Sequence, residues 1–259
     1  MWEIFLSNDP QVHLAVVTGA SAGLGRALSY RLTENGVRVV GLARNATELD
    51  ITAERCGHDM FFPMVCNVAD SENVHKVADE IKEKIGHVNI LINNAAVLDD
   101  YDFLSSDTQV INSQIMTNLL GQINCAKAFL PHMFAQDKGR IVNVGSFAGE
   151  NPVNGNLGYS VSKAGTRCFS LALARELEIK LPIVIVSEWI PGILRTRCGR
   201  PDGIDTDLAA QWGVKLALDR RVDIHGKTYL KDKEFAGSIS ARKKVSDAVL
   251  LSVELFRKF

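Results

Sequence analysis

The stretch Thr18-Gly19-Ala20-Ser21-Ala22-Gly23-Leu24-Gly25 decides the fold. It follows the apolar run Leu14–Thr18, which is typical of a buried strand, and it leads into the helical pattern Leu24–Asn35. Glycines in such a turn let the backbone approach a pyrophosphate, and the N-terminus of the following helix offers free N–H groups. The spacing is Gly-x-x-x-Gly-x-Gly, so the strand–turn–helix context carries the prediction of a dinucleotide site.

Apolar runs and helical patterns alternate along the rest of the chain. The predicted strands are Leu14–Thr18, Arg38–Leu42, Phe61–Cys66, Ile90–Asn93, Arg140–Val144, Ile183–Val186 and Thr228–Leu230. The predicted helices are Leu24–Asn35, Ser71–Ile85, Ile111–Gln136, Ser160–Lys180 and Asp205–Arg220. Near-continuous Val, Ile and Leu in the strands is typical of a parallel sheet that is covered on both faces. The alternation predicts a doubly wound α/β fold of the Rossmann type, with about seven strands and helices on both faces.

The chain has 259 residues and no internal repeat or Pro/Gly-rich linker, which predicts one domain over residues 1–259. Two segments break the alternation. A stretch near residues 195–220 begins with a loop rich in Gly, Arg and Pro, and we expect it to contact substrate. Residues 241–259 show an amphipathic pattern that predicts an added C-terminal helix.

Composition excludes several function classes. Apolar residues make up 46% and charged residues 23% of the chain, and the net charge is -1, so no basic excess indicates nucleic acid or anionic lipid. The five cysteines show no Cys-x-x-Cys pair, and the six histidines have no metal-like spacing. No secretory leader or membrane-spanning run is visible. We expect a reduced, soluble, cytoplasmic protein without a metal.

The second predicted strand indicates which dinucleotide binds. An NAD site usually carries Asp or Glu about 20 residues after the phosphate turn, where it binds the ribose 2′-OH. Here the strand ends in Ala43-Arg44, without an acid. Ala43 exerts no repulsion on a 2′-phosphate, and the Arg44 guanidinium can pair with it. NADP(H) is therefore favoured over NAD(H); the alternative is that Arg44 is an ordinary solvated side chain.

Four polar residues form a candidate catalytic set. Tyr159 and Lys163 are four residues apart in a predicted helix, so they face the same side. A nearby ammonium favours the phenolate and lets a phenol exchange protons closer to neutral pH. Ser146 follows a predicted strand at the ligand-binding end of the sheet. Asn118 lies inside a predicted helix, where Asn is unfavourable unless its side chain has a purpose.

Together these pieces resemble the short-chain dehydrogenase/reductase family, in its NADP-dependent carbonyl reductase-like branch. The matching segments, in the family's order, are Thr18–Gly25, Asn93–Ala96, Asn118–Gly121, Ser146, Tyr159 with Lys163, and Pro191-Gly192 leading to Thr196. They extend over roughly residues 14–230.

The resemblance implies a role for each matching position. Tyr159 would be the acid/base, Lys163 would hold the nicotinamide ribose and lower the pKa of Tyr159, Ser146 would orient the substrate oxygen, and Asn118 would anchor a water of a proton relay. The implied cofactor contacts are Gly19, Ser21, Gly23 and Leu24 at the pyrophosphate, Arg44 at the 2′-phosphate, Asn67, Val68, Asn94 and Ala95 around the adenosine, Tyr159 and Lys163, and Pro191, Gly192 and Thr196 near the carboxamide. Several positions depart from the family pattern. Asn67 replaces a frequent Asp, Gly145 stands where a second Ser is frequent, Ile190 replaces a common Asn, and the phosphate turn lacks the basic residue of some NADP-dependent members.

The predicted function is NADP(H)-dependent interconversion of a carbonyl compound and its alcohol. Two alternatives remain open, namely a non-catalytic dinucleotide-binding regulator, and an epimerase or dehydratase of the same fold. Apolar side chains such as Trp189, Ile193, Leu208 and Trp212 near the substrate segment suggest a partly apolar carbonyl substrate. The resemblance also implies a homodimer or homotetramer that is formed through the two long helices 111–136 and 160–180.

Overall fold

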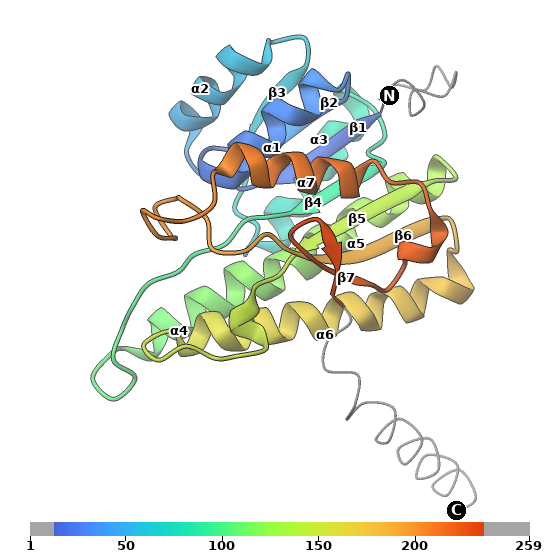
Figure 1. Ribbon diagram of the computed structural model, residues 1–259. Coiled ribbons are helices and arrows are strands. Elements are labelled where there is room, and N and C mark those ends of the chain that lie inside the picture. Colours follow the sequence, from blue (N-terminus) through green and yellow to red (C-terminus); the bar gives the residue numbers. More distant parts are fainter. Residues whose placement is uncertain (1–12, 236–259) are drawn as a thin grey trace, which may run out of the picture.

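The computed structural model describes residues 13–235, which form one mixed sheet between two layers of helices (Figure 1). Within these residues the sheet has eight strands in the order β3-β2-β1-β4-β5-β6-β7-β8. The strands are β1 Leu14–Thr18, β2 Arg38–Ala43, β3 Phe61–Val65, β4 Ile90–Asn93, β5 Gly139–Val144, β6 Val184–Ile190, β7 Thr228–Leu230 and β8 Lys233–Glu234. All neighbours pair in parallel except β7 and β8, which are antiparallel.

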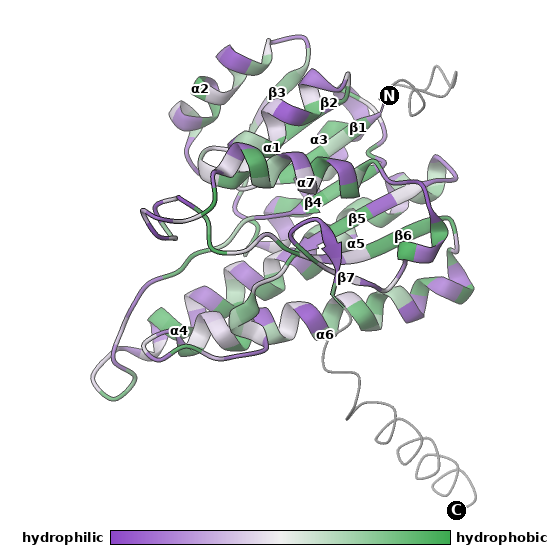
Figure 2. Ribbon diagram, in the orientation of Figure 1, coloured by the Kyte–Doolittle hydropathy of each residue, from purple (hydrophilic) through white to green (hydrophobic). Residues whose placement is uncertain are grey.

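The helices cover both faces of the sheet, and each face has its own apolar core. They are α1 Gly23–Glu34, α2 Ala46–Cys56, α3 Ser71–Lys84, α4 Thr108–Ile115, α5 Gly121–Ala135, α6 Leu157–Lys180 and α7 Thr206–Ala217. Alternate residues of β1 point to opposite cores: Val17 packs in the one that includes α1, α2 and α7, and Val16 in the one that includes α3, α5 and α6. Figure 2 shows that the strands are mainly hydrophobic and that the helices contain both hydrophobic and hydrophilic residues. The doubly wound fold predicted from sequence is therefore confirmed.

The chain reverses its winding direction between β1 and β4, which are neighbours in the sheet. From β1 the chain moves outward to β2 and β3, and it then returns to β4 and continues to the other side. Such a switch point leaves a crevice beyond the carboxyl ends of the two central strands, which is where α/β proteins bind ligands. The phosphate turn follows β1 and Asn94 follows β4, so both lie at this crevice.

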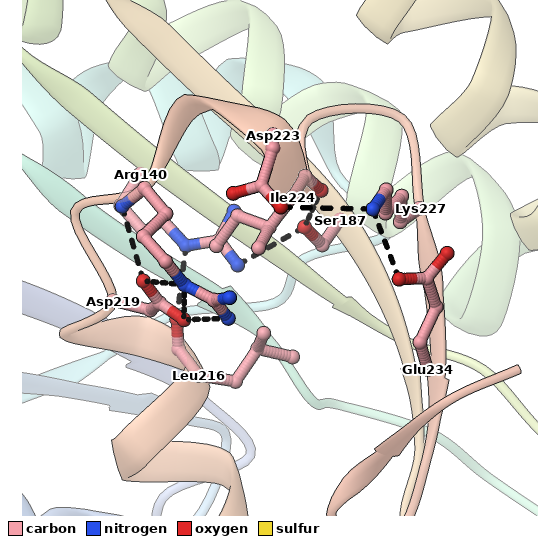
Figure 3. A network of polar contacts seen from close by, with 9 residues as sticks. Arg140, Ser187, Leu216, Asp219, Asp223, Ile224, Lys227 and Glu234 are labelled. Carbon is pink, nitrogen blue, oxygen red and sulfur yellow. Dashed lines mark hydrogen bonds and ion pairs between the residues drawn. The ribbon is translucent and has the colours of Figure 1, made fainter.

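A buried guanidinium fastens α7 to the sheet away from this crevice (Figure 3). Arg140, at the start of β5, is 5% exposed and donates to the carbonyls of Leu216 and Ile185 and to the Ser187 hydroxyl. Ser187 in turn donates to the carbonyl of Ile224 in the short 3-10 turn η3, Val222–Ile224. One side chain thus joins β5, β6, α7 and the connection that leads to β7.

The structure differs from the sequence prediction in several elements. Helix α2 was missed, because its apolar face has few large residues and its start depends on a cap in which the Asn45 side-chain oxygen accepts from the backbone N–H of Glu48. The short hairpin strand β8 was also missed, and the strand predicted to end at Val186 continues to Ile190 through the polar pair Ser187-Glu188.

Two predicted segments differ in their internal structure. The predicted helix over 111–136 consists of α4, a π-helical turn η1 at Met116–Leu120, and α5. The predicted substrate segment 195–220 contains α7, which packs on α1, so its loop parts are residues 195–205 before the helix and 218–220 after it. The predicted C-terminal helix 241–259 lies outside the described residues. No helix within residues 13–235 is both long and apolar enough to cross a membrane.

Candidate active site

The phosphate turn is held against the end of β4. The Thr18 hydroxyl accepts hydrogen bonds of 2.9 Å from the backbone N–H groups of both Asn94 and Ala95. The Asn94 amide donates back to the Thr18 carbonyl at 2.8 Å. Gly19 has φ +69°, and a Cβ there would lie 3.0 Å from the Cα of Ala95. The turn can therefore pack this closely only with glycine at position 19.

The N-terminus of α1 opens toward the same turn. Its cap residue, Ala22, offers no side-chain hydrogen bond, so the first N–H groups of α1 receive no cap from it. Gly23 has φ +50°, and a Cβ there would lie 3.3 Å from Cγ2 of Thr196. The loop after β6 thus brings Thr196 to the phosphate turn, although the two segments are far apart in sequence. Free N–H groups and the positive end of a helix dipole suit an anion such as a pyrophosphate.

A polar cleft of about 690 Å³ lies beside the turn. It is lined by Ser21, Ala22, Arg44, Asn45, Ala46, Glu48 and Arg197. The Glu48 carboxylate is paired with Arg26 at 2.6 Å, whereas within residues 13–235 Arg44 and Arg197 form no ion pair. Two guanidinium groups without carboxylate partners therefore face one cleft, which suits a phosphate group.

The other two arginines of the substrate loop are paired within the loop. Arg195 lies 2.6 Å from the carboxylate of Asp205, and Arg200 lies 3.0 Å from that of Asp202. The loop therefore presents one arginine without a carboxylate partner, Arg197, to the cleft.

Helix α6 and the end of β5 bring the catalytic candidates together. The Ser146 side chain hydrogen-bonds the Tyr159 phenol. Lys163 is 2% exposed, donates to the Val144 carbonyl at 2.8 Å, and has its Nζ 5.6 Å from the centroid of the Tyr159 ring. The i,i+4 spacing in α6 thus places phenol and ammonium side by side, next to the serine that follows β5.

The electrostatics of this group are set mainly by burial. Burial raises the pKa of Tyr159, and the hydrogen bond with Ser146 opposes the rise. This is opposite to the lowering predicted from Lys163, because burial has the largest effect on the phenol and the ammonium donates to the Val144 carbonyl. Burial also lowers the pKa of Lys163 to about 8, while the charge of Glu188 opposes the fall. Lys163 can therefore exchange a proton closer to neutral pH than the Tyr159 phenol can.

Asn118 lies in the π-helical turn η1 and is fully buried. Its side-chain oxygen accepts from the Val97 N–H at 2.7 Å, and its amide donates to the Val97 carbonyl and to the Ser162 hydroxyl. A π turn widens a helix locally and recurs at functional sites. Here it joins Asn118 to the segment after β4 and to α6, and its role in a proton relay stays a prediction.

Other predicted positions lie around the same crevice. Asn67 and Val68 follow β3: the side-chain oxygen of Asn67 accepts from the N–H of Ala69, and the Val68 carbonyl accepts from Asn124 on α5. Pro191 and Gly192 follow β6, and Gly192 has φ +92°. Trp189, expected near the substrate, is instead fully buried between the sheet and α7. In the described part of the chain, no cluster of His, Cys, Asp and Glu could hold a metal.

The contacts of three residues in this region could not be predicted from the sequence. Thr18 is the anchor of the phosphate turn, Arg197 lines the cleft with Arg44, and Glu188 lies near Lys163. The sequence signal for Glu188 is the polar pair Ser187-Glu188, which interrupts an otherwise apolar strand. Arg197 has no such signal, because its position depends on how the loop after β6 folds back.

Comparisons with known proteins agree with this arrangement. The family model described as short chain dehydrogenase matches residues 13–206. A bovine 3-oxoacyl-[acyl-carrier-protein] reductase is 36% identical over 183 residues, which are 71% of this chain and 76% of the bovine protein. Carbonyl reductase family member 4 of Danio rerio is 37% identical over 71% of this chain and 76% of its own. Acetoacetyl-CoA reductase of Cupriavidus necator is 35% identical over 81% of this chain and 87% of its own.

Solved structures share the fold. A crystal structure described as a short-chain dehydrogenase/reductase from Burkholderia xenovorans has a TM-score of 0.78 at 27% identity and covers 85% of this chain and 94% of its own. An actinorhodin polyketide ketoreductase crystallised with NADPH also has a TM-score of 0.78, at 23% identity, and covers 85% of this chain and 95% of its own.

Proposed function

This chain belongs to the short chain dehydrogenase family of oxidoreductases, and we propose that it is an NADP(H)-dependent reductase that interconverts a carbonyl compound and its alcohol. The observation that carries the proposal is the contact of Ser146, Tyr159 and Lys163 at the crevice that also holds the phosphate turn. An acid/base, an oxygen-orienting hydroxyl and an anion site at one end of a sheet are the protein parts that hydride transfer to a carbonyl needs.

The residues present fit a dinucleotide phosphorylated at the 2′ position. Gly19, Ser21, Gly23 and Leu24 would hold the pyrophosphate, because the turn is tight and the start of α1 has no side-chain cap. Arg44, with Arg197 across the cleft, would hold the 2′-phosphate. When bound, NADPH would supply the hydride. The solved ketoreductase with NADPH and the relatives named as reductases support this cofactor.

Three side chains would supply the proton transfer and the orientation of the substrate oxygen. The Tyr159 hydroxyl would donate its proton to the carbonyl oxygen in reduction and take one from the alcohol in oxidation. Its raised pKa keeps the phenol protonated at neutral pH, which suits the reductive direction. Ser146 would hydrogen-bond the same oxygen, and Lys163, at a pKa of about 8, would return a proton to the phenol.

For the substrate we propose a 3-oxoacyl thioester. The support comes from relatives named for 3-oxoacyl-[acyl-carrier-protein] and acetoacetyl-CoA. Exposed apolar side chains in the segment that follows β6, including Ile193 and Leu208, suit an acyl chain. As the location we propose the cytoplasm, which the free thiols of all five cysteines suit.

The test begins with binding and continues with turnover. Purified protein is titrated with NADPH and NADH by fluorescence, and NADPH absorbance is then followed with acetoacetyl-CoA and with a set of simple ketones and aldehydes. We expect tighter binding of NADPH, and turnover that falls by about 10²–10⁴-fold in Tyr159→Phe. Tyr30→Phe, a tyrosine on α1 that packs against Arg55, is the matched control and keeps full activity.

Each alternative function gives a different result. A protein that binds neither dinucleotide would refute the proposal. Binding without turnover of any carbonyl compound would favour the regulatory alternative. Product formation without net NADPH consumption would indicate an epimerase or dehydratase.

A further inference from the structure

Glu188 is an acid in the middle of a fully buried strand. All seven residues of β6 are buried, and Glu188 itself is 2% exposed. Removing a carboxylate from water is unfavourable unless cations and hydrogen bonds compensate for the lost hydration. The proposed reaction assigns this carboxylate no role, so its surroundings need a separate explanation.

The compensation comes from α6 and from the neighbouring strand. The Thr228 hydroxyl of β7 donates to the Glu188 carboxylate at 2.8 Å. Arg167 has a nitrogen 3.7 Å from Glu188 and pairs with Glu150 at 2.5 Å. Arg167 lies one helical turn after Lys163, so α6 directs two cations toward this region. Glu188 and Glu150 balance the charges of Lys163 and Arg167.

The same carboxylate fills the space beside Gly145. A Cβ at Gly145 would meet Oε1 of Glu188 and lie 3.0 Å from its Cγ and Cδ. Gly145 does not have a positive φ, so its backbone conformation does not require glycine. Its neighbours are Val144, whose carbonyl accepts from Lys163, and Ser146, which bonds Tyr159. Glu188 therefore packs directly against the segment that carries both contacts.

We propose that Glu188 is a positioning residue of the active site, which supports the segment Val144–Ser146 through contact with Gly145 and supplies a negative charge to the region that holds the Lys163 ammonium. This inference about Glu188 rests on the proposed function only for its effect on catalysis. The contacts and the charge of Lys163 can be measured without a substrate. Loss of Glu188 is expected to neutralise Lys163 at working pH, and so to weaken proton return to Tyr159.

The direction of the electrostatic effect supports this. Burial lowers the pKa of Lys163 to about 8, and Glu188 is the charge that opposes this fall. In return, Lys163 and Arg167 both lower the pKa of Glu188, which burial raises. The charged and titratable groups around this pair are Arg167, Glu150 and Tyr159, with Cys198 beyond the phenol. Without Glu188, the remaining cation Arg167 would disfavour the ammonium further.

The first experiment measures the titration of Lys163 directly. Protein with ¹³C-labelled lysine is titrated by NMR, and the Lys163 signal is assigned by its loss in Lys163→Met. We expect the Lys163 midpoint in Glu188→Gln to fall by about one pH unit. Glu150→Gln is the matched control, because it removes the other partner of Arg167 and leaves Glu188 in place; the Lys163 midpoint should move less. An unchanged midpoint in Glu188→Gln would refute the electrostatic part of the proposal.

The second experiment tests the packing contact between Gly145 and the Glu188 carboxylate. It also covers the case in which Glu188→Gln folds poorly. Thermal unfolding is compared for the wild type, Gly145→Ala, Glu188→Ala and the double variant. We expect Gly145→Ala to lower the Tm in the presence of Glu188 and to have little effect when position 188 is Ala. Equal effects in both backgrounds would overturn the packing contact.

Turnover measurements test the effect of Glu188 on catalysis. They also distinguish a failure of the Glu188 proposal from a failure of the proposed function. If acetoacetyl-CoA or a simple ketone is reduced, the pH profile of kcat/KM in Glu188→Gln should shift toward acid by the same amount as the Lys163 midpoint. A shifted midpoint with an unshifted profile would refute the positioning role. If no carbonyl compound is reduced by the wild type, the proposed function fails, while the NMR and Tm results still decide the role of Glu188.

Discussion

Arg44 stands at the end of β2, where it and Arg197 line the cleft beside the phosphate turn. A guanidinium recognises a phosphate through two parallel hydrogen bonds, and it gains little from a ribose hydroxyl. The difference in affinity between NADPH and NADH should therefore depend mainly on Arg44. Substitution of this one residue can measure it.

Arg44→Ala should weaken NADPH binding and leave NADH binding nearly unchanged. A charged hydrogen bond contributes about 1.5–3 kcal/mol, which corresponds to a loss of about 10–100-fold in the affinity for NADPH. Fluorescence or calorimetric titration gives both dissociation constants. Arg38→Ala, at the other end of β2, is the control. Equal losses for the two dinucleotides would show that Arg44 does not contact a 2′-phosphate.

At the scale of elements, Arg140 holds α7 and the connection to β7 onto the sheet. Its guanidinium satisfies two buried carbonyls and the Ser187 hydroxyl. Removing a buried donor leaves these acceptors without partners, and each such loss is unfavourable. Arg221, in the same region, pairs with Asp219 but is 64% exposed at its side chain.

Arg140→Met should destabilise the protein by about 2–3 kcal/mol, because Met keeps the volume of the side chain and loses every donor. Chemical denaturation at neutral pH measures the change. Arg221→Ala should leave the unfolding midpoint nearly unchanged, because water solvates an exposed pair almost as well. If both variants were equally stable, the buried network would not hold α7.

At the scale of the whole molecule, stability should depend on pH through His132. This side chain on α5 is 4% exposed, and its Nδ1 accepts from the N–H of Val88. Burial lowers its pKa to about 4, and the adjacent His87 acts in the same direction. Between the ordinary His pKa and this value the unfolded chain binds a proton that the folded chain does not. The contribution of His132 to the free energy of unfolding is therefore fully present above the ordinary His pKa. It is lost as the pH drops toward 4.

We expect a loss of about 2 kcal/mol in the free energy of unfolding between about pH 7.5 and about pH 5 from this group. Urea denaturation at the two pH values measures it. His132→Asn keeps an acceptor near the Nδ1 position and should remove this part of the pH dependence. The exposed His75→Asn is the control. An equal pH dependence in wild type and His132→Asn would contradict the assignment.

The assembly of whole molecules is a further prediction. Exposed apolar side chains lie on the helices expected to form the interface, among them Leu120, Phe134 and Ile179. A groove of about 330 Å³ between α5 and the end of α6 adds to this surface. We expect a homodimer or homotetramer by light scattering, and a smaller species for Phe134→Asp. A wild-type monomer would refute this interface.

Local patterns in the sequence were sufficient to predict the fold and to select the catalytic candidates, whose roles stay predictions. The glycine turn after Leu14–Thr18, the alternation of apolar strands with helices, and the i,i+4 spacing of Tyr159 and Lys163 each depend on residues close together in the chain. A buried strand and a helix face leave periodic traces, so β1, β4 and β7 have the predicted bounds. Helix α2 left a weak trace because few large apolar residues mark its buried face.

Contacts between distant segments were decided only by the tertiary structure. Arg197 reaches the cleft because the loop after β6 folds back onto the start of α1, and the charge of Glu188 acts on Lys163 because β6 packs against α6. The direction of the Tyr159 pKa was predicted wrongly for the same reason, since burial depends on everything packed around the phenol. Residue type and spacing determine which chemistry a chain can carry. Burial and the charges that surround each group, which only packing brings together, determine at what pH and toward which partner it acts.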